Sequence, residues 1–211
     1  TNNKQKIQID DKLDCVVHLA AKTDSREAQK IPGEYYRVNI LGTLNILEFC
    51  RNTGSRLVFA STGQVCGKPK YLGIDEKHLT NPDNPYTKSK LLAENLCKNY
   101  SDDFGVNSII LRFFNIYGPG QKENFFIPKV LYAFFRGSTL KLNPPNAKRD
   151  FVYIDDIIDS IKMAINYNKN NFEIFNIATG KPISVKQIVS MAQKISNKKV
   201  NVEYTFERKE V

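Results

Sequence analysis

Short runs of apolar residues alternate along this chain with longer stretches in which apolar positions recur every three or four residues. The runs at 15–21, 56–60 and 106–114 are continuous, as expected for strands buried on both faces of a sheet. The periodic stretches at 34–53 and 85–100 predict amphipathic helices. This alternation of strand and helix signals is typical of an α/β protein with a parallel sheet, and we expect that fold class.

Capping residues define several helix ends. Asn84 and Pro85 form a strong helix start, because asparagine caps a helix and proline suits its first position. Gly54 and Gly137 suit the left-handed residue that ends a helix, and Ser184 opens a capping box. The other expected elements are helices at 128–136, 155–168 and 184–197, strands at 172–177 and 199–204, and an irregular stretch at 142–147.

Composition narrows the function classes. The 211 residues are enough to bury a sizeable core. The sequence contains no run of about 18 apolar residues, so it predicts no membrane-spanning helix. The net charge of +9 comes from scattered lysines without a basic block or a nucleic-acid-binding motif. We therefore expect a small anionic ligand, no nucleic acid and no membrane.

The cysteines give no sign of a metal site or of disulfides. Cys15, Cys50, Cys66 and Cys97 lie far apart, form no C-x-x-C pair and are accompanied by two histidines. No signal-peptide pattern is visible in the first residues. We expect no metal, reduced thiols and a cytoplasmic enzyme.

Tyr86 and Lys90 stand four residues apart near the start of the predicted helix 85–100, so they share one of its faces. A tyrosine hydroxyl has an ordinary pKa of about 10, which is too high for a base at neutral pH. A nearby ammonium and the positive end of a helix both favour the tyrosinate, so the pair suits a general base and the group that tunes it. The same spacing also occurs on solvated helix faces.

Two hydroxyl residues stand at the end of the preceding strand. Ser61 and Thr62 follow the buried run 56–60, and open α/β sheets bind ligands at the carboxyl ends of their strands. A hydroxyl at this place could hydrogen-bond the substrate oxygen that Tyr86 deprotonates. Ordinary turn chemistry also explains a serine and a threonine here.

Seven motifs, in order and over nearly the whole chain, resemble one enzyme family. It is the extended short-chain dehydrogenase/reductases, and within them the NAD-dependent epimerase/dehydratase group typified by UDP-glucose 4-epimerase. The matching motifs are His18-Leu-Ala-Ala21, Val38-Asn-Ile-Leu-Gly-Thr43, Phe59-Ala-Ser-Thr62 with Gly67, Asn84-Pro-Tyr86 with Lys90, Leu111-Arg-Phe-Phe-Asn115 with Tyr117-Gly-Pro119, Arg149-Asp-Phe-Val-Tyr-Ile-Asp-Asp156, and Phe175-Asn-Ile-Ala-Thr-Gly180 with Ser184-Val185.

This resemblance implies a Rossmann-like doubly wound parallel sheet with a small α/β substrate-binding lobe. Residues 1–120 would form the C-terminal part of the NAD(P)-binding domain, and residues 121–211 mostly the nucleotide-sugar lobe, with some segments returning to the Rossmann domain. The chain contains no G-x-x-G-x-x-G loop, and its first buried strand matches the family's fourth. We therefore expect a fragment, truncated at the N-terminus before the glycine-rich part and lacking a closing C-terminal segment.

The resemblance also implies roles for individual residues. The catalytic set would be Tyr86 as base, Lys90 to hold the nicotinamide ribose, and Thr62 to hydrogen-bond the sugar oxygen. Cofactor contacts would come from Ala20, Ala21, Lys22, Asn39, Ser61, Tyr86, Lys90 and Phe113. Substrate contacts would come from Thr62, Asn115, Arg149 and Arg208, the two arginines gripping the diphosphate. We expect NAD, or else NADP, as the cofactor and a UDP-sugar as the substrate.

The alternatives within the family are a 4,6-dehydratase and a keto-sugar reductase. Dehydratases carry a glutamate just after the catalytic threonine, whereas this chain has Gly63 and Gln64, and glutamine exchanges no proton at neutral pH. We therefore favour 4-epimerisation by transient oxidation at C4, while noting that a reductase shares the same tyrosine, lysine and threonine. A non-catalytic binding protein on the same fold is an alternative of another class.

Two further features bear on ligand and assembly. Relatives carry a Gly-Asp-Gly-like turn where this chain has residues 143–147, which leaves the nucleotide base and the sugar open. Relatives also pair two helices per subunit, which here are 34–53 and 85–100, so we expect a homodimer of the full protein. The apolar positions that favour this pairing are Tyr35, Leu41, Leu44, Leu96 and Tyr100.

Overall fold

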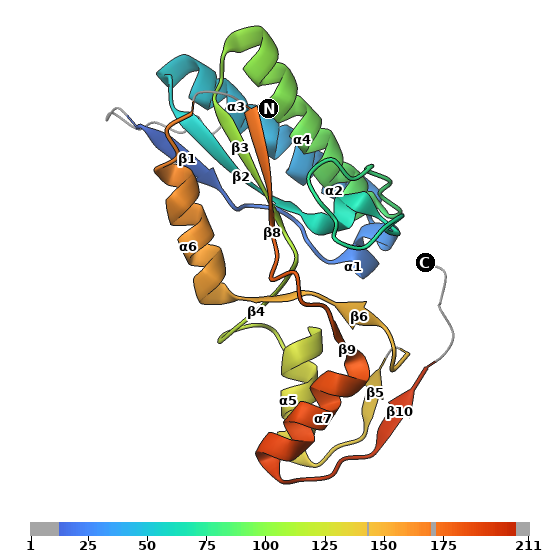
Figure 1. Cartoon of the computed structure of the whole chain (residues 1–211). Coiled ribbons are helices and arrows are strands. Elements are labelled where there is room, and N and C mark those ends of the chain that lie inside the picture. Colours follow the sequence, from blue (N-terminus) through green and yellow to red (C-terminus); the bar gives the residue numbers. More distant parts are fainter. Residues whose placement is uncertain (1–12, 143, 170–171, 206–211) are drawn as a thin grey trace.

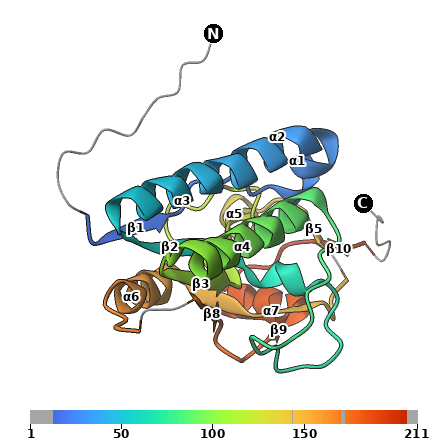
Figure 2. The same cartoon turned by 90° about the horizontal axis from the view of Figure 1, so that it is seen from above.

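The computed structural model describes residues 13–142, 144–169 and 172–205, and within them a four-stranded parallel sheet forms the centre. In spatial order its strands are β1 (Cys15–His18), β2 (Arg56–Thr62), β3 (Ser108–Phe113) and β8 (Phe172–Ile177). Helices α3 (Gly42–Thr53) and α4 (Pro85–Phe104) cover one face, and α6 (Ile154–Ile165) covers the other (Figures 1 and 2). The predicted α/β class with a parallel sheet is confirmed.

The central strands contribute side chains to two hydrophobic cores. Leu57 and Phe59 of β2 pack with α3 and α4, whereas the intervening Val58 packs with α6. In β3 the same alternation places Ile110 in the first core and Ile109 in the second. Because successive strand residues point to opposite faces, burial on both faces requires the continuous apolar runs seen in the sequence.

The predicted helix 34–53 consists of three segments. They are α2 (Pro32–Tyr36), a π-helical turn η1 (Arg37–Leu41) and α3. A π turn inserts one residue into the helical repeat and often occurs at functional sites. Asn39 lies in this turn and is 1% exposed, so the turn directs an amide into the protein interior.

The predicted caps are confirmed. Gly54 ends α3 with φ 71°, and Asn84 caps α4, which runs to Phe104 rather than to Tyr100. The C-terminal capping box also forms, because Ser184 Oγ accepts from the Gln187 backbone N–H at 3.2 Å. Local hydrogen bonds that the sequence specifies therefore set these helix ends.

A smaller lobe lies below the sheet in the view of Figure 1. Its helices α5 (Phe126–Arg136) and α7 (Val185–Ser196) pack together on the parallel strands β5 (Leu140–Leu142) and β10 (Val202–Tyr204). Two short strand pairs join the lobe to the sheet layer. They are β4 (Asn115–Tyr117) with β7 (Phe151–Tyr153), and β6 (Lys148–Arg149) with β9 (Ile183–Ser184).

Several elements differ from the sequence expectations. Helix α1 (Ser25–Lys30) and the 3₁₀ turn η2 (Gly63–Cys66) were not expected, and α6 ends at Ile165 rather than at residue 168. Strand β8 and helix α6 come after residue 120 in the chain but belong to the sheet layer. The division of the chain into two domains at residue 120 stays a prediction.

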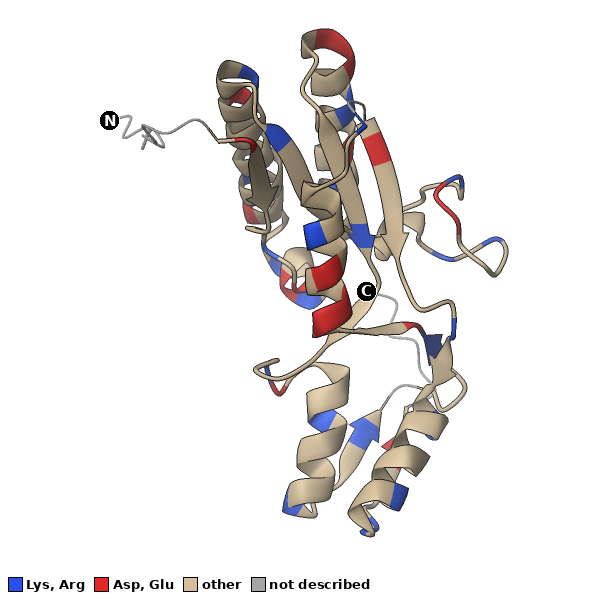
Figure 3. Cartoon of the chain, turned by 60° about the vertical axis from the view of Figure 1, so that its left-hand side comes forward, with Lys and Arg blue, Asp and Glu red and all other residues tan. Residues whose placement is uncertain are grey.

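In the view of Figure 3, lysines and arginines are dispersed over the sheet layer and the lobe. No helix in the described part of the chain combines the length and the apolar character needed to cross a membrane.

Candidate active site

A cavity of about 1100 Å³ opens at the carboxyl ends of β2 and β3. Its walls also include the first turns of α4, the segment 121–129 and one face of α6. The predicted site residues that line it are Ala21, Ser61, Thr62, Tyr86, Lys90, Phe113, Asn115 and Arg149. Ala20, Lys22 and Asn39 lie outside this lining, and Arg208 lies outside the described residues.

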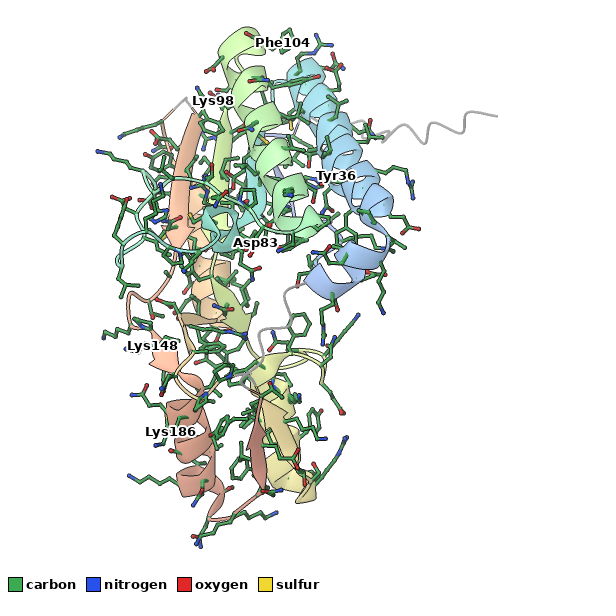
Figure 4. The ribbon with its side chains drawn as sticks, turned by 90° about the vertical axis from the view of Figure 1, so that its right-hand side faces the viewer. Tyr36, Asp83, Lys98, Phe104, Lys148 and Lys186 are labelled. Atoms are coloured by element: carbon green, nitrogen blue, oxygen red, sulfur yellow. The ribbon has the colours of Figure 1, made fainter. Side chains whose placement is uncertain are left out.

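Helix α4 is fixed at its start by reciprocal hydrogen bonds. Asn84 Oδ1 accepts from the Thr87 backbone N–H at 3.1 Å, and Thr87 Oγ1 accepts from the Asn84 N–H at 3.3 Å. Figure 4 labels Asp83 just before this cap and Phe104 at the far end of the helix. The turn that carries Tyr86 therefore has a set direction toward the cavity.

Tyr86 and Thr62 both line the cavity wall. Burial raises the pKa of Tyr86, and the Thr62 side chain opposes this rise. Lys90 is 3% exposed, with its Nζ 4.0 Å from the centroid of the Phe59 ring, and burial lowers the pKa of Lys90 to about 8. Desolvation favours the neutral form of both groups, so a tyrosinate here depends on positive charge brought close to it.

Thr62 is held by the turn that follows it. Its Oγ1 accepts from the Gln64 backbone N–H at 3.2 Å, which leaves the hydroxyl proton free to be donated. A Cβ placed on Gly63 would lie 2.6 Å from the Phe114 ring, so this ring packs directly on the backbone beside Thr62. Phe114 thereby forms a rigid wall of the cavity next to the two hydroxyls.

Asn39 supports the cavity wall from behind. Its Oδ1 accepts from the Lys22 N–H at 2.9 Å, and its Nδ2 donates to the Lys22 carbonyl at 3.0 Å and to Ser89 Oγ at 2.9 Å. These bonds fix the backbone that follows β1, in which Ala21 lines the cavity. The amide thus acts on the predicted cofactor wall through the backbone of residue 22.

Two other predicted cofactor residues have side chains engaged by acidic groups. Lys22 Nζ lies 2.7 Å from Glu34 Oε2 and 3.4 Å from Glu27 Oε1 at the surface, and these contacts raise the pKa of Lys22. The Ser61 hydroxyl donates to the buried carboxylate of Glu94. Both side chains are therefore already bonded, and the backbone N–H and carbonyl of Lys22 are bonded to Asn39.

The lobe contributes a half-buried cation to the same cavity. Arg149 lies on β6 with its guanidinium carbon 5.6 Å from the centroid of the Phe126 ring, and burial lowers the pKa of Arg149. It forms no ion pair within the described part of the chain. A planar guanidinium without a carboxylate partner is available to an anionic ligand.

Asp150 connects three crossings of the chain between sheet layer and lobe. Its carbonyl accepts from the Asn115 backbone N–H at 3.1 Å and from Asn115 Nδ2 at 2.9 Å. Its carboxylate accepts from the Thr179 N–H at 2.9 Å and from Thr179 Oγ1 at 2.7 Å. Asn115 and Arg149, which both line the cavity, therefore belong to segments that Asp150 holds together and bonds to Thr179.

Sequence reasoning missed part of the cavity wall. Phe126, Phe151 and Gln121 line it, and so does Lys129, whose Nζ donates to the Lys141 carbonyl at 2.6 Å. The only local signal for the aromatic wall was the pair of phenylalanines just before the predicted helix 128–136.

A family model, the NAD dependent epimerase/dehydratase family, matches residues 1–178. A Methanocaldococcus jannaschii protein provisionally named UDP-glucose 4-epimerase is 38% identical over 193 residues, which cover 87% of this chain and 61% of that protein. GDP-6-deoxy-D-mannose reductase of Pseudomonas aeruginosa is 28% identical over 199 residues, covering 90% of this chain and 65% of the reductase.

Solved structures give the same result for the fold. The structure of MoeE5 in complex with UDP-glucose and NAD superposes with a TM-score of 0.86 and 31% identity, over 92% of this chain and 66% of that one. The predicted Rossmann-like fold is therefore confirmed. The chain spans about three fifths of the length of the curated relatives it matches first.

Proposed function

Because the chain belongs to the NAD-dependent epimerase/dehydratase family, we propose that the complete protein is a nucleotide-sugar 4-epimerase. One observation carries this proposal. Tyr86 and Thr62 place two hydroxyl groups on the wall of a cavity that also contains Arg149, which forms no ion pair within the described residues. A sugar diphosphate needs a base at its sugar and a cation at its phosphates, and this cavity offers both.

The wall formed by the ends of β1 and β2 fits the nicotinamide half of NAD. Leu19 and Ala21 leave backbone groups accessible there, and Lys90 supplies a buried cation without an ion-pair partner in the described part of the chain. NAD, when bound, supplies a reversible hydride acceptor. We propose NAD as the cofactor, with NADP as the alternative.

The chain's own residues then handle the proton and the oxygen at C4. Tyr86 takes the proton from the C4 hydroxyl, while Thr62 hydrogen-bonds the same oxygen and keeps it in place. Lys90 holds the ribose and, when charged, favours the tyrosinate. The keto-sugar then rotates in the cavity so that its opposite face is presented for reduction at C4. Tyr86 returns the proton to the C4 oxygen of the epimeric product.

Asn115 and Arg149 contact the sugar diphosphate in this proposal. The guanidinium fork matches phosphate oxygens, and the stacked Phe126 ring restricts its orientation. Arg208 would be the second arginine, a role that rests on the sequence because it lies outside the described residues. A UDP-sugar is the substrate we propose, since the similar MoeE5 was solved with UDP-glucose.

Gln64 favours epimerisation over dehydration. It lines the cavity two residues after Thr62, and its amide cannot serve as the acid or base that water elimination needs. A keto-sugar reductase is the second candidate, because it needs only Tyr86, Lys90 and Thr62 and because the chain is similar to GDP-6-deoxy-D-mannose reductase.

Product analysis tests the proposal. The complete native protein is incubated with UDP-glucose, UDP-glucuronate and dTDP-glucose in the presence of NAD, and the products are resolved by NMR. An equilibrium mixture of C4 epimers is the expected result. Accumulation of a 4-keto-6-deoxy sugar would identify a dehydratase, and consumption of NADPH with a keto-sugar would identify a reductase.

We also propose a cytoplasmic homodimer that pairs α3 and α4. Leu41, Leu92 and Phe104 expose 50%, 45% and 56% of their surfaces on or beside these helices. Tyr35 cannot contribute as expected, because it is fully buried and its hydroxyl donates to the Asp24 carbonyl at 2.7 Å. Light scattering of the complete protein at micromolar concentration tests the pairing, and a monomer would refute it.

A further inference from the structure

A buried arginine–glutamate pair lies directly behind the proposed catalytic residues. Arg112 Nη2 is 2.7 Å from Glu94 Oε2, and Arg112 Nε lies 3.1 and 3.2 Å from the two carboxylate oxygens. The two side chains are only 4% and 3% exposed. Neither residue was expected to matter from the sequence, and neither has a role in the mechanism above.

Glu94 shares a helix face with the catalytic pair. It follows Lys90 by four residues and Tyr86 by eight, so the three side chains line one side of α4. Lys90 and Tyr86 meet the cavity, whereas Glu94 lies one turn deeper and is absent from the cavity lining. The position of Glu94 along the sheet therefore sets the position of the two residues ahead of it.

Arg112 anchors this face to the strands. In the sheet register Arg112 of β3 is opposite Ser61 of β2, and the Ser61 hydroxyl donates to Glu94. The next residue of β2 is Thr62, which lines the cavity together with Tyr86. One carboxylate thus connects α4, β2 and β3 at the row just before the reacting groups.

Stability alone is a poor reason for such a pair. Removing two charges from water costs as much as their attraction returns, and well-packed apolar residues can do as well. Apolar residues cannot fix the relative orientation of two elements in this way. A guanidinium can donate two parallel hydrogen bonds to a carboxylate in only a few orientations. Arg112 Nη1 has no hydrogen-bond partner among the described residues, so Glu94 alone holds this guanidinium in place.

Resting on the proposed function, we propose that Glu94 and Arg112 are positioning residues that fix the Tyr86–Lys90 face of α4 relative to Thr62. They touch neither substrate nor cofactor. Their action is on the distance and direction between the base on α4 and the hydroxyl on β2. A charge-preserving change that spoils the fork should therefore lower the rate of the chemical step and spare substrate binding.

Arg112→Lys in the complete protein makes that change, because lysine keeps the charge and loses the two-pronged geometry. We expect kcat to fall roughly 10- to 100-fold, as misplacement of reacting groups does, with KM within about threefold of wild type. Arg136→Lys is the matched control. Arg136 also holds a glutamate, Glu123, by two bonds of 3.1 and 2.9 Å, but at the surface and away from the cavity lining.

A second variant, Glu94→Gln combined with Arg112→Met, removes both charges and leaves no buried charge unpaired. If either variant unfolds cooperatively near the wild-type temperature and keeps wild-type kcat, the positioning role is wrong. It is also wrong if KM rises as much as kcat falls, or if every variant fails to fold, since the pair would then be only a core element.

A readout without turnover separates this proposal from the proposed function. Tyr86 ionisation is followed by ultraviolet difference absorbance against Tyr86→Phe. We expect its midpoint pH to rise in Arg112→Lys, because the Thr62 side chain that opposes the rise in the Tyr86 pKa is displaced, and to stay unchanged in Arg136→Lys. If wild type turns over no nucleotide sugar but the midpoint moves as expected, only the proposed function fails. An unmoved midpoint refutes the positioning role.

Discussion

Asn39 Nδ2 donates a hydrogen bond of 2.9 Å to Ser89 Oγ, a contact that joins residues 50 positions apart in the chain. Ser89 stands between the turns that carry Tyr86 and Lys90, and Ser89 Oγ in turn donates to the Tyr86 carbonyl at 2.7 Å. The π-helical turn η1 and the start of α4 are therefore bonded to each other behind the cavity.

Asn39→Ala should destabilise the protein by about 2–3 kcal/mol, because it leaves two backbone groups of Lys22 and the Ser89 hydroxyl without their partner. Urea unfolding measures the change. Asn166→Ala is the control, since that exposed amide only donates to the Lys162 carbonyl at the end of α6. A loss no larger than that of the control would contradict the supporting role of Asn39.

Tyr86→Phe should lower turnover of the complete protein by about 10²- to 10⁴-fold, the usual contribution of a general base. The unfolding temperature should change little, because the ring remains packed. Tyr100→Phe on the same helix is the control, where a hydroxyl bonded to Glu48 at 2.6 Å is lost away from the cavity. Activity of Tyr86→Phe within tenfold of wild type would refute the proposed base.

His18 predicts a loss of stability in mild acid. Its pKa is lowered from 6.5 to about 4, first by burial and then by Lys90. The unfolded chain binds a proton as the pH falls through 6.5, whereas folded His18 stays neutral to about pH 4, so the free energy of unfolding decreases across this window. At pH 5 the decrease should be about 2 kcal/mol.

His18→Gln should remove most of this pH dependence in urea unfolding between pH 7 and pH 5. Thr43 Oγ1 donates to the Asn39 carbonyl at 2.7 Å, so His18 Nε2, 3.2 Å away, must be the donor to Thr43. Glutamine can keep this hydrogen bond without titrating. Equal pH profiles for the variant and wild type would show that another group causes the loss.

Gly67→Ala should cost about 3 kcal/mol or more. Gly67 has φ 61° and ψ −138°, and a Cβ there would lie 2.0 Å from the Asn81 carbonyl oxygen. Gly54→Ala gives the cost of a left-handed backbone without a steric contact, because Gly54 has nothing within 4 Å, and about 1–2 kcal/mol is expected. Thermal unfolding compares the two, and equal losses would show that the contact with Asn81 relaxes freely.

Local signals explain what the sequence predicted of the fold. Strand 172–177 was placed to the residue, and the caps at Asn84 and Ser184 were identified because each bonds within its own first turn. The short pairs of β4 with β7 and of β6 with β9 were missed. Their strands are two or three residues long and exist only through partners more than 30 positions away.

The site divides in the same way. Tyr86, Lys90 and Thr62 carry recognisable spacing, and the structure brings all three to one cavity. The π turn at Asn39 has no local signal, because it depends on bonds to Lys22 and Ser89. The orientation of the Lys22 ammonium toward Glu34 likewise requires α2 to fold back beside the end of β1.

Asp150 has a mechanical consequence for how the cavity can open. Since it bonds Asn115 on one crossing and Thr179 on another while belonging to the third, it acts as a single pivot for all three connections. We therefore expect a swing of the lobe to turn the three connections together. Asp150→Ala should weaken this connection, because the Thr179 amide loses its carboxylate partner. Hydrogen exchange at the Thr179 amide should then become faster, while exchange of the sheet amides stays slow. Unchanged protection of the Thr179 amide would mean that the lobe is hinged elsewhere.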